Sequence, residues 1–510
     1  MALLDFFRRR KAEPVLLRAP GAVATWTSAP QGKRGQSGWL GAQPSRLLAD
    51  LPGGYGFAPN RDIRWQLDTL RNRSRWLAQN EGYTAGFLKS LRRNVVGAKG
   101  FTLQMQVKSD RGTGVDKNAN DRIEAGFARW SRRGNCDVTG RHSWVDMCGL
   151  VMLAVARDGE ALLRLHRAGE YGLQMEMLDP SQLETDRNGR PEGTAQGNVV
   201  RAGVELTPLG RPAAYWMRSH VPNDDPAALS VPLRQTVRVP AEDMIHLFLP
   251  EWPQQIRGVP WISNGIRALA MLDGYGEAEL TAARVAAAKM GFYRIDADAE
   301  PDGDLEGDGT LVQEASAGTF ELLPKGVDFQ QFDPQHPNAA FKDFVAAMLR
   351  PIAAGAGVSY NAFANDAENM NYSGLRHTAL EDRDEYRTLQ HWMISGLCEP
   401  IFTAWLREAL ITGAIGLPAG KMWKFDAPRF VPRGWQWVDP LKEVAAVEKA
   451  VGLGIASRTA TVAAQGGDFA ETVAELQAEK ALMGDLIQPT SPPPALPAPP
   501  AEPDADDEDD

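Results

Sequence analysis

The sequence predicts an α+β fold built around long helices. Three observations carry this prediction: helical spacing of apolar residues over 62–156, short apolar segments between turn signals over 160–250, and further helical patterns after residue 260. The pattern over 373–410 corresponds to a rod about 55 Å long at 1.5 Å per residue. A rod of this length exceeds the width of a compact domain and predicts an elongated subunit.

The N-terminal half is expected to begin with three helices. Residues 62–93, 118–132 and 143–156 each place apolar side chains on one helical face. Gly97 is expected to help end the first helix, and the turn at Gly159 to close the third, because glycine tolerates the backbone angles found after a helix.

The stretch from 160 to 250 has the pattern of β-strands. The segments ALLRLH, LQMEMLD, GVELTP, AAYWMRS and MIHLFLP are short and apolar, and Gly, Pro or Asn signals separate them. Meanders and hairpins are therefore expected here, in contrast to the helices on either side.

The C-terminal half returns to helices, interrupted by two irregular stretches. An alanine-rich helix is expected over 261–290, a shorter one over 338–354 and a long one over 373–410, bent at Pro400. The stretch GVSYNAFANDAENMNYSGLR lies between the last two and is longer than the usual connection of about 2–8 residues. Ser373 is expected to cap the long helix.

Charge is unevenly distributed along the chain. Residues 1–100 hold 17 Lys and Arg against 6 Asp and Glu, a net charge of +11, whereas the whole chain carries −10, which leaves −21 on residues 101–510. A protein that wraps DNA tightly would need a basic surface, because neutralised phosphates supply most of that affinity. The chain as a whole is not of that kind.

Composition also limits the compartment and the fold. Cys136, Cys148 and Cys398 are widely spaced and form no disulfide framework, which favours synthesis in a reducing cytoplasm. The apolar run 147–156 is about half of the roughly 20 residues that a membrane span needs. No signal peptide and no membrane partner are expected.

Catalytic motifs are missing from the sequence. It contains no G-x-x-x-x-G-K-[ST], no H-E-x-x-H and no G-x-S-x-G, so we expect no catalytic residue, no cofactor and no metal site. The acidic stretch 296–309 matches a calcium loop at its first ligands but has Gly309 where the bidentate Glu belongs. A solvated acidic loop is the favoured interpretation, with weak divalent-ion binding as the alternative.

Six stretches occur in an order that resembles one known family. They are RNVVGAKGFTLQ (93–104), ARDGEALLRL (156–165), GVELTPLGRPAAYW (203–216), MIHLFLPEWPQQIRGVPWIS (244–263), AAGAGVSYNAFANDAENMNYSGLR (353–376) and WVDPLKE (437–443). Together they resemble the lambda-family portal proteins of tailed bacteriophages over about residues 60–455. Trp252 stands where that pattern is more basic, which puts a charge role there in doubt.

The resemblance implies a ring-forming, elongated subunit with a mixed α/β wing, long stem helices, a small α/β clip insertion and a helical crown. The implied division is 1–60 extended basic arm, 61–255 wing, 256–290 first stem helix, 291–335 clip, 336–356 second stem helix, 357–376 tunnel loop, 377–436 long kinked helix returning to the wing, 437–486 crown and 487–510 disordered Pro-rich, acidic tail.

The same resemblance implies a function and a set of contact residues. A portal is a twelve-subunit ring at one capsid vertex, through which terminase pumps double-stranded DNA and to which the head-tail connector attaches. The tunnel loop would meet DNA through Tyr360, Asn361, Phe363, Asn365, Asn369, Asn371 and Tyr372. The clip would meet the large terminase subunit and the connector through Asp302, Asp304, Glu306 and Asp308.

Further expectations follow from the implied role. The protein would be made in the host cytoplasm, assemble with capsid or scaffold proteins, and end in the virion at the portal vertex. The basic stretch 8–11 would engage scaffold, capsid protein or DNA, or would be a solvated end. Two other readings stay open: another head-tail connector or baseplate component, and a metal-dependent DNA-processing enzyme, which needs a carboxylate cluster that binds Mg²⁺.

Overall fold

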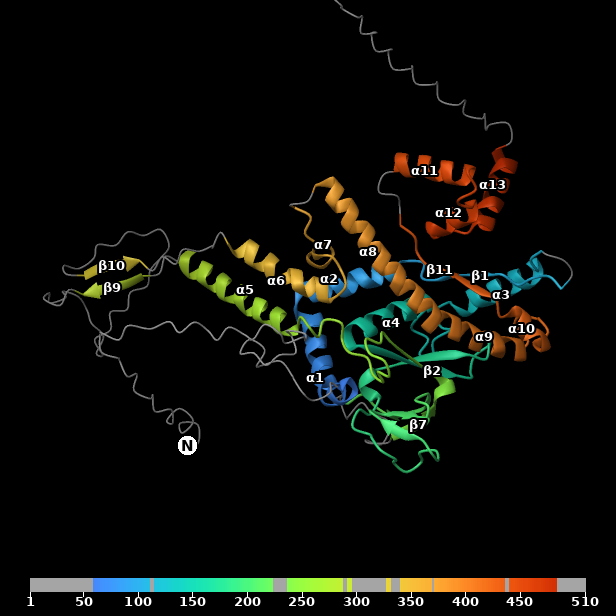
Figure 1. Ribbon diagram of the computed structural model, residues 1–510, viewed down its shortest axis with the longest axis horizontal. Coiled ribbons are helices and arrows are strands. Elements are labelled where there is room, and N and C mark those ends of the chain that lie inside the picture. Colours follow the sequence, from blue (N-terminus) through green and yellow to red (C-terminus); the bar gives the residue numbers. More distant parts are fainter. Residues whose placement is uncertain are drawn as a thin grey trace, which may run out of the picture. The chain divides into compact units, whose positions relative to one another are not determined.

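A computed structural model of the chain is shown in Figure 1. It describes residues 58–110, 114–222, 236–287, 291–295, 327–331, 340–368, 371–435 and 440–483. The chain divides into two compact units, Met1–Ala58 and Pro59–Asp510, and nearly all described residues belong to the second. The predicted arm up to residue 57, the tail 487–510 and most of the clip 291–335 lie outside the described residues.

The first predicted helix is in fact two helices. α1 (Pro59–Asn80) ends one residue before Glu81, and α2 (Gly82–Leu91) begins after it. The break has a local cause, because the Glu81 carboxylate accepts hydrogen bonds from the backbone N–H groups of Tyr83 and Thr84 and so caps α2. A π-helical turn, Arg92–Val96, extends α2 as far as Gly97, whose φ of +69° ends it as predicted.

The next two helices follow the sequence pattern closely. α3 (Lys117–Trp130) buries Ile123, Phe127 and Trp130 on one face. α4 (Trp144–Asp158) ends at Gly159, which has a φ of +91°. A side chain there would also collide with the backbone of Val259, since an added Cβ would lie 2.5 Å from its carbonyl carbon. The predicted turn is therefore also a point of close backbone approach.

Two antiparallel sheets fill the predicted β-region. In the first, β2 (Glu160–His166) lies between β3 (Gln174–Leu178) and β8 (Met244–Phe248). The second has four strands in chain order: β4 (Val199–Arg201), β5 (Val204–Leu206), β6 (Pro212–Arg218) and β7 (Thr236–Pro240). All five apolar segments singled out from the sequence contain a strand, so this prediction is confirmed.

A buried carboxylate joins the helices to the sheet. Glu160, at the start of β2, has a fully buried side chain. It accepts hydrogen bonds from Arg71 Nη2 of α1 at 2.8 Å and from Arg257 Nε at 2.9 Å. His246 of β8 lies 2.9 Å away through Nε2, and the backbone N–H of Gly258 donates at 3.2 Å. One side chain thus links α1, β2, β8 and the segment that leads to the next helix.

Helices are present within both stretches where the sequence predicted them, 261–290 and 338–354. α5 (Ile266–Ala287) packs beside α6 (Phe341–Gly355), as Figure 1 shows. Between them in sequence, β9 (Gly291–Ile295) and β10 (Val327–Gln331) form an antiparallel pair. Pro351 does not end α6, because its ring replaces only one backbone donor near the end of the helix.

The long helix after residue 371 is interrupted where a bend was predicted. α8 (Tyr372–Met393) leads into a π-helical turn, Ile394–Cys398, and then into α9 (Glu399–Ile411). Pro400 lies in the first turn of α9, where a missing N–H is tolerated, and the wider turn before it accommodates the ring. The short helix α10 (Met422–Phe425) follows.

The core brings distant segments of the chain together. β11 (Pro428–Val431) pairs with β1 (Thr102–Met105), more than 300 residues earlier. Trp405 of α9 packs edge-on against Phe127 of α3, with ring centroids 5.2 Å apart. Such aromatic pairs add about 0.5–1.5 kcal/mol beyond their buried area. The three cysteines are free and buried in this region of the fold, as expected.

The C-terminal described residues are helical, as predicted. They form α11 (Pro440–Gly452), α12 (Arg458–Ala464) and α13 (Phe469–Met483). Within the part of the chain that the structure describes, no helix has both the length and the apolar character required to cross a bilayer.

We predict that Glu160→Gln destabilises the fold by about 3–5 kcal/mol, because it leaves two buried guanidinium groups without their counter-charge. The matched control is Glu176→Gln, which removes a half-exposed partner of His166 and should cost only about 0–1 kcal/mol. Denaturant unfolding of both variants measures the difference. Equal stability of the two variants would contradict the structural role of Glu160.

The Glu160 network also predicts a pH dependence. Burial alone would raise the pKa of Glu160, but the charge of Arg257 and the bonds from His246 and Arg257 hold this pKa well below its usual range. Its stabilising contribution is therefore present above the unfolded pKa of about 4.3 and is lost as pH falls below it. Unfolding midpoints measured between pH 7 and pH 3 should fall more for the wild type than for Glu160→Gln.

Candidate functional site

The stretch 357–376 is less open than the sequence predicts. Five of its residues form a short helix, α7 (Tyr360–Ala364), and its last residues belong to the first turn of α8. α7 packs against α2 and α6. The stretch is therefore a folded protrusion with an exposed tip, and we name the described residues between α6 and α8 together with Tyr372 the tip segment.

The first half of the tip segment is fixed to α8. Asp382 accepts two hydrogen bonds from Ser359, from its backbone N–H at 2.9 Å and from its hydroxyl at 2.7 Å. The Ser359 hydroxyl oxygen in turn accepts from the backbone N–H of Ala362 at 3.1 Å and starts α7. The carboxylate of Asp382 on α8 thus fixes the position of the tip segment just after α6.

Phe363 anchors the segment to the core. It is 2% exposed, and its ring lies 5.5 Å from that of Phe87 on α2. The resemblance to portal proteins implied that Phe363 meets DNA, but its side chain is occupied in core packing. We therefore leave it out of the contact surface.

Polar contacts stiffen the second half of the segment. The Tyr360 hydroxyl donates to Asp366 Oδ2 at 3.0 Å, and the Arg350 guanidinium lies 5.6 Å from the Tyr360 ring centroid. Burial and this hydrogen bond raise the pKa of Tyr360, while the N–H of Glu368 and the Tyr360 hydroxyl lower the pKa of Asp366. An ion pair joins Glu368 to Lys342 of α6.

The exposed part of the tip is mainly uncharged. Asn365 is exposed and has a φ of +52°, a left-handed conformation that asparagine tolerates better than most residues. Asn371 is exposed and caps α8 by accepting from the Gly374 N–H at 2.7 Å, so the predicted cap Ser373 is wrong by two residues. Tyr372 is 61% exposed.

The other predicted site residues divide into two groups. Asn361 is half-buried on α7. Asn369 and the clip acids lie outside the described residues, and these acids are Asp302, Asp304, Glu306 and Asp308.

The chemistry of the tip is that of a contact surface. Its exposed amide groups and phenol can donate and accept hydrogen bonds, but they supply neither a strong base nor an activated nucleophile. Its two carboxylates, Asp366 and Glu368, are bonded to Tyr360 and Lys342. Among the described residues there is no group of three His, Cys, Asp or Glu side chains that could hold a metal ion. The tip can touch a partner and release it without carrying out a reaction.

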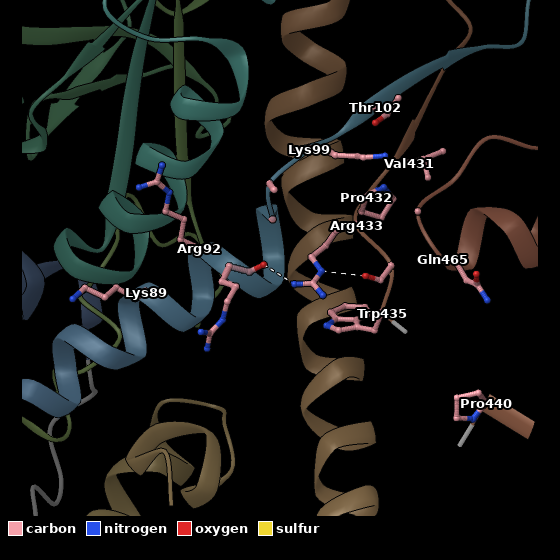
Figure 2. A pocket seen from close by; sticks show the side chains of 16 residues that line it. Lys89, Arg92, Lys99, Thr102, Val431, Pro432, Arg433, Trp435, Pro440 and Gln465 are labelled. Atoms are coloured by element: carbon pink, nitrogen blue, oxygen red, sulfur yellow. Dashed lines mark hydrogen bonds between the residues drawn. The ribbon is translucent and has the colours of Figure 1, made fainter. Parts of the chain in front are cut away.

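A second surface was missed by sequence reasoning. A cleft of about 1260 Å³ lies between the end of α2, the segment after β11 and the region of α12 (Figure 2). We name it the basic cleft, since five cationic side chains line it: Lys89, Arg92, Arg93, Lys99 and Arg433. The sequence signalled this cleft only through the net charge of +11 on residues 1–100. Arg433 lies far away in the sequence and is brought to the cleft by the pairing of β11 with β1.

Comparison with known proteins identifies a family. The family model described as "Phage portal protein, lambda family" matches residues 53–390. The chain is 36% identical to the probable portal protein of Halomonas phage phiHAP-1 over 74% of this chain and 73% of that protein. It is 22% identical to portal protein B of Escherichia phage lambda, over 78% of this chain and 81% of that one.

Solved structures give a weaker likeness. One similar chain comes from the neck of an empty gene transfer agent (GTA) particle, computed with C6 symmetry. The match covers 79% of this chain and 93% of that one, at 16% identity and with a TM-score of 0.43. The neck of the native GTA particle, computed with C12 symmetry, matches with a TM-score of 0.39 at 13% identity, over 83% of this chain and 94% of that one.

We predict that Asp382→Ala loosens the tip segment without unfolding α8. The loss of two hydrogen bonds to Ser359 should lower the local opening free energy by about 1–3 kcal/mol. Hydrogen exchange of peptides covering 357–368 measures this effect. Asp384→Ala is the control, since Asp384 makes only an exposed pair with Arg387 on the same helix. Unchanged exchange in the Asp382 variant would rule out this anchor.

Proposed function

The chain belongs to the lambda family of phage portal proteins, and on that premise we propose that its subunits form a twelve-membered ring around a DNA channel. As a portal protein it is a structural component of the virion at the capsid vertex, not an enzyme. This membership decides against the DNA-processing enzyme and the separate connector component that the sequence had left open. The finer roles below are our proposals.

The tip segment is proposed to face the passing DNA, and one observation carries this proposal. The segment is held on the core by Asp382 and Phe363, yet its exposed end presents Asn365, Asn371 and Tyr372. A contact with moving DNA must be repeatable and brief. Neutral amides can bond phosphate oxygens without the counterion release that makes lysine and arginine contacts strong.

The remaining parts receive roles by their position in the chain. The α5–α6 pair is proposed to be the stem, and the β9–β10 pair the base of a clip formed by 291–335. The clip is proposed to meet the large terminase subunit during packaging and the head-tail connector afterwards. α11–α13 are proposed to form the crown. Capsid or scaffold proteins are the proposed partners during assembly.

The ring is tested by electron microscopy of the purified protein together with native mass. We expect rings of about twelve subunits with a central channel wide enough for duplex DNA. A uniform monomer in isolation, and again after mixing with its scaffold and capsid proteins, would overturn the ring proposal.

The tip contact is tested by adding charge at one position. We expect Asn365→Lys to slow DNA packaging into proheads, because each subunit would add an ammonium group that binds phosphate, and the slowing should shrink as salt is raised. Asn365→Ala is the control, since it carries the same penalty for a left-handed backbone, about 1–2 kcal/mol, without the charge. Equal packaging rates for the two variants would count against a DNA contact at the tip.

A further inference from the structure

The basic cleft is a concentration of charge that the channel proposal does not use. Four of its cations come from the stretch 89–99, and Arg433 follows β11. Figure 2 shows Lys89 and Arg92 on the helical side of the cleft, with Arg433 and Trp435 on the segment that faces them. Residues 101–510 carry a net charge of −21, so this positive cluster is opposite in sign to the net charge of most of the chain.

These cations lack counter-charges within the part of the chain that the structure describes. None of the five lining cations forms an ion pair there, and none of the described residues that line the cleft is acidic. Two further cations, Arg383 and Arg387, lie nearby on α8 beside Trp435, although Arg387 also pairs with Asp384. Burial and the charges of Arg383 and Arg93 lower the pKa of Arg433.

Backbone carbonyls hold one of the cleft cations, Arg433, in place. Arg433 donates from Nη1 to the carbonyl of Arg93 at 2.8 Å and from Nε to that of Gly434 at 3.1 Å. Its guanidinium also lies 5.2 Å from the Trp435 ring centroid. An added Cβ at Gly97 would lie 2.9 Å from Arg433 Cδ, so the absence of a side chain there makes room for the arginine.

The size of the cleft argues against a small-molecule ligand. Its volume of about 1260 Å³ exceeds the roughly 300–1000 Å³ of typical small-molecule pockets. Several cations without acids fit an extended polyanion instead. Each strand of duplex DNA carries about one negative charge per 3.4 Å of the helix axis, so a single backbone can meet several of these cations at once.

An acidic face of a second copy fits less well. Among the exposed or half-exposed acids of α8, for example, three already have partners within their own chain. Glu381 pairs with His377, Asp382 with Ser359 and Asp384 with Arg387.

We propose that the basic cleft binds the phosphate backbone of duplex DNA at a site distinct from the tip segment. The proposal rests on the proposed function only in that DNA is the cargo of the particle. The DNA bound in the cleft would be DNA that the tip segment does not touch. Binding there would not depend on the base sequence, because phosphate contacts carry no sequence information.

The test uses the assembled full-length protein and a covalently closed duplex minicircle. A closed circle cannot thread through a closed ring, so its binding reports on surfaces outside the channel. The cleft variant is Lys89→Gln, Arg93→Gln and Lys99→Gln combined, because all three side chains are exposed. The control is Lys108→Gln, Lys117→Gln and Arg129→Gln combined, which removes the same charge from exposed positions outside the cleft.

The measured quantity is the slope of log affinity against log salt concentration. Each phosphate contact contributes about 0.9 to this slope, so the cleft variant should lose about two to three relative to the wild type, and the control variant should keep the wild-type slope. Native mass of each variant, measured alongside, shows whether assembly is intact.

Several outcomes would overturn the proposal. They are an equal slope in the cleft variant and the wild type, an equal loss in both variants, and no measurable binding of the minicircle at low salt. A changed native mass with an unchanged slope would instead assign the cleft to contacts between subunits. Failure of the channel proposal is separate, because minicircle binding at the cleft does not require DNA to pass the tip.

Discussion

The buried carboxylate of Glu160 is the constraint on which the rest of this subunit depends. A lone ionised side chain at full burial would be strongly unfavourable, so the fold must bring Arg71, Arg257 and His246 to it at the same time. These partners come from α1, from the segment that leads to α5 and from β8. The requirement to satisfy one charge therefore fixes how the helical layer, the sheet and the start of the stem pair lie relative to one another. The glycine pair at 159 and 258 serves the same junction, since an added Cβ on Gly258 would lie 1.9 Å from the Gly159 carbonyl oxygen.

That rigid junction explains how a polar tip can be held at a defined place. α5 begins at Ile266, nine residues after Arg257, and the tip segment follows α6. Phe363 and Asp382 then fix the segment to α2 and α8, so that only a few residues at its end remain exposed. The tip is a short exposed end on a packed base, not a free loop, which suits a surface that must meet a moving polymer repeatedly at the same position.

The two surfaces proposed to meet DNA differ in the strength of contact that they favour. The tip offers amides and a phenol, whose hydrogen bonds exchange readily with water and release few counterions. The basic cleft offers five cations that form no ion pair among the described residues, and a phosphate backbone would neutralise them. Weak contact permits sliding, and strong contact favours retention. With the two kinds of contact on different segments, one subunit would be able to do both, and the negative charge of most of the chain would keep DNA from adhering elsewhere.

The sequence by itself determined the local elements and the family. Periodicity located the strands of 160–250 and most helices, glycines marked the ends at Gly97 and Gly159, and six ordered stretches pointed to portal proteins. It erred where a side chain acts on nearby backbone: Glu81 splits the first helix, and Asn371 caps α8 in place of Ser373. Only the tertiary structure decided that Phe363 packs in the core, that Glu160 gathers partners from three segments, and that Arg433 completes a cleft begun by residues 89–99. The reason is physical: hydrophobic period and capping act over a few residues, whereas burial of a charge or assembly of a cleft depends on contacts between residues hundreds of positions apart.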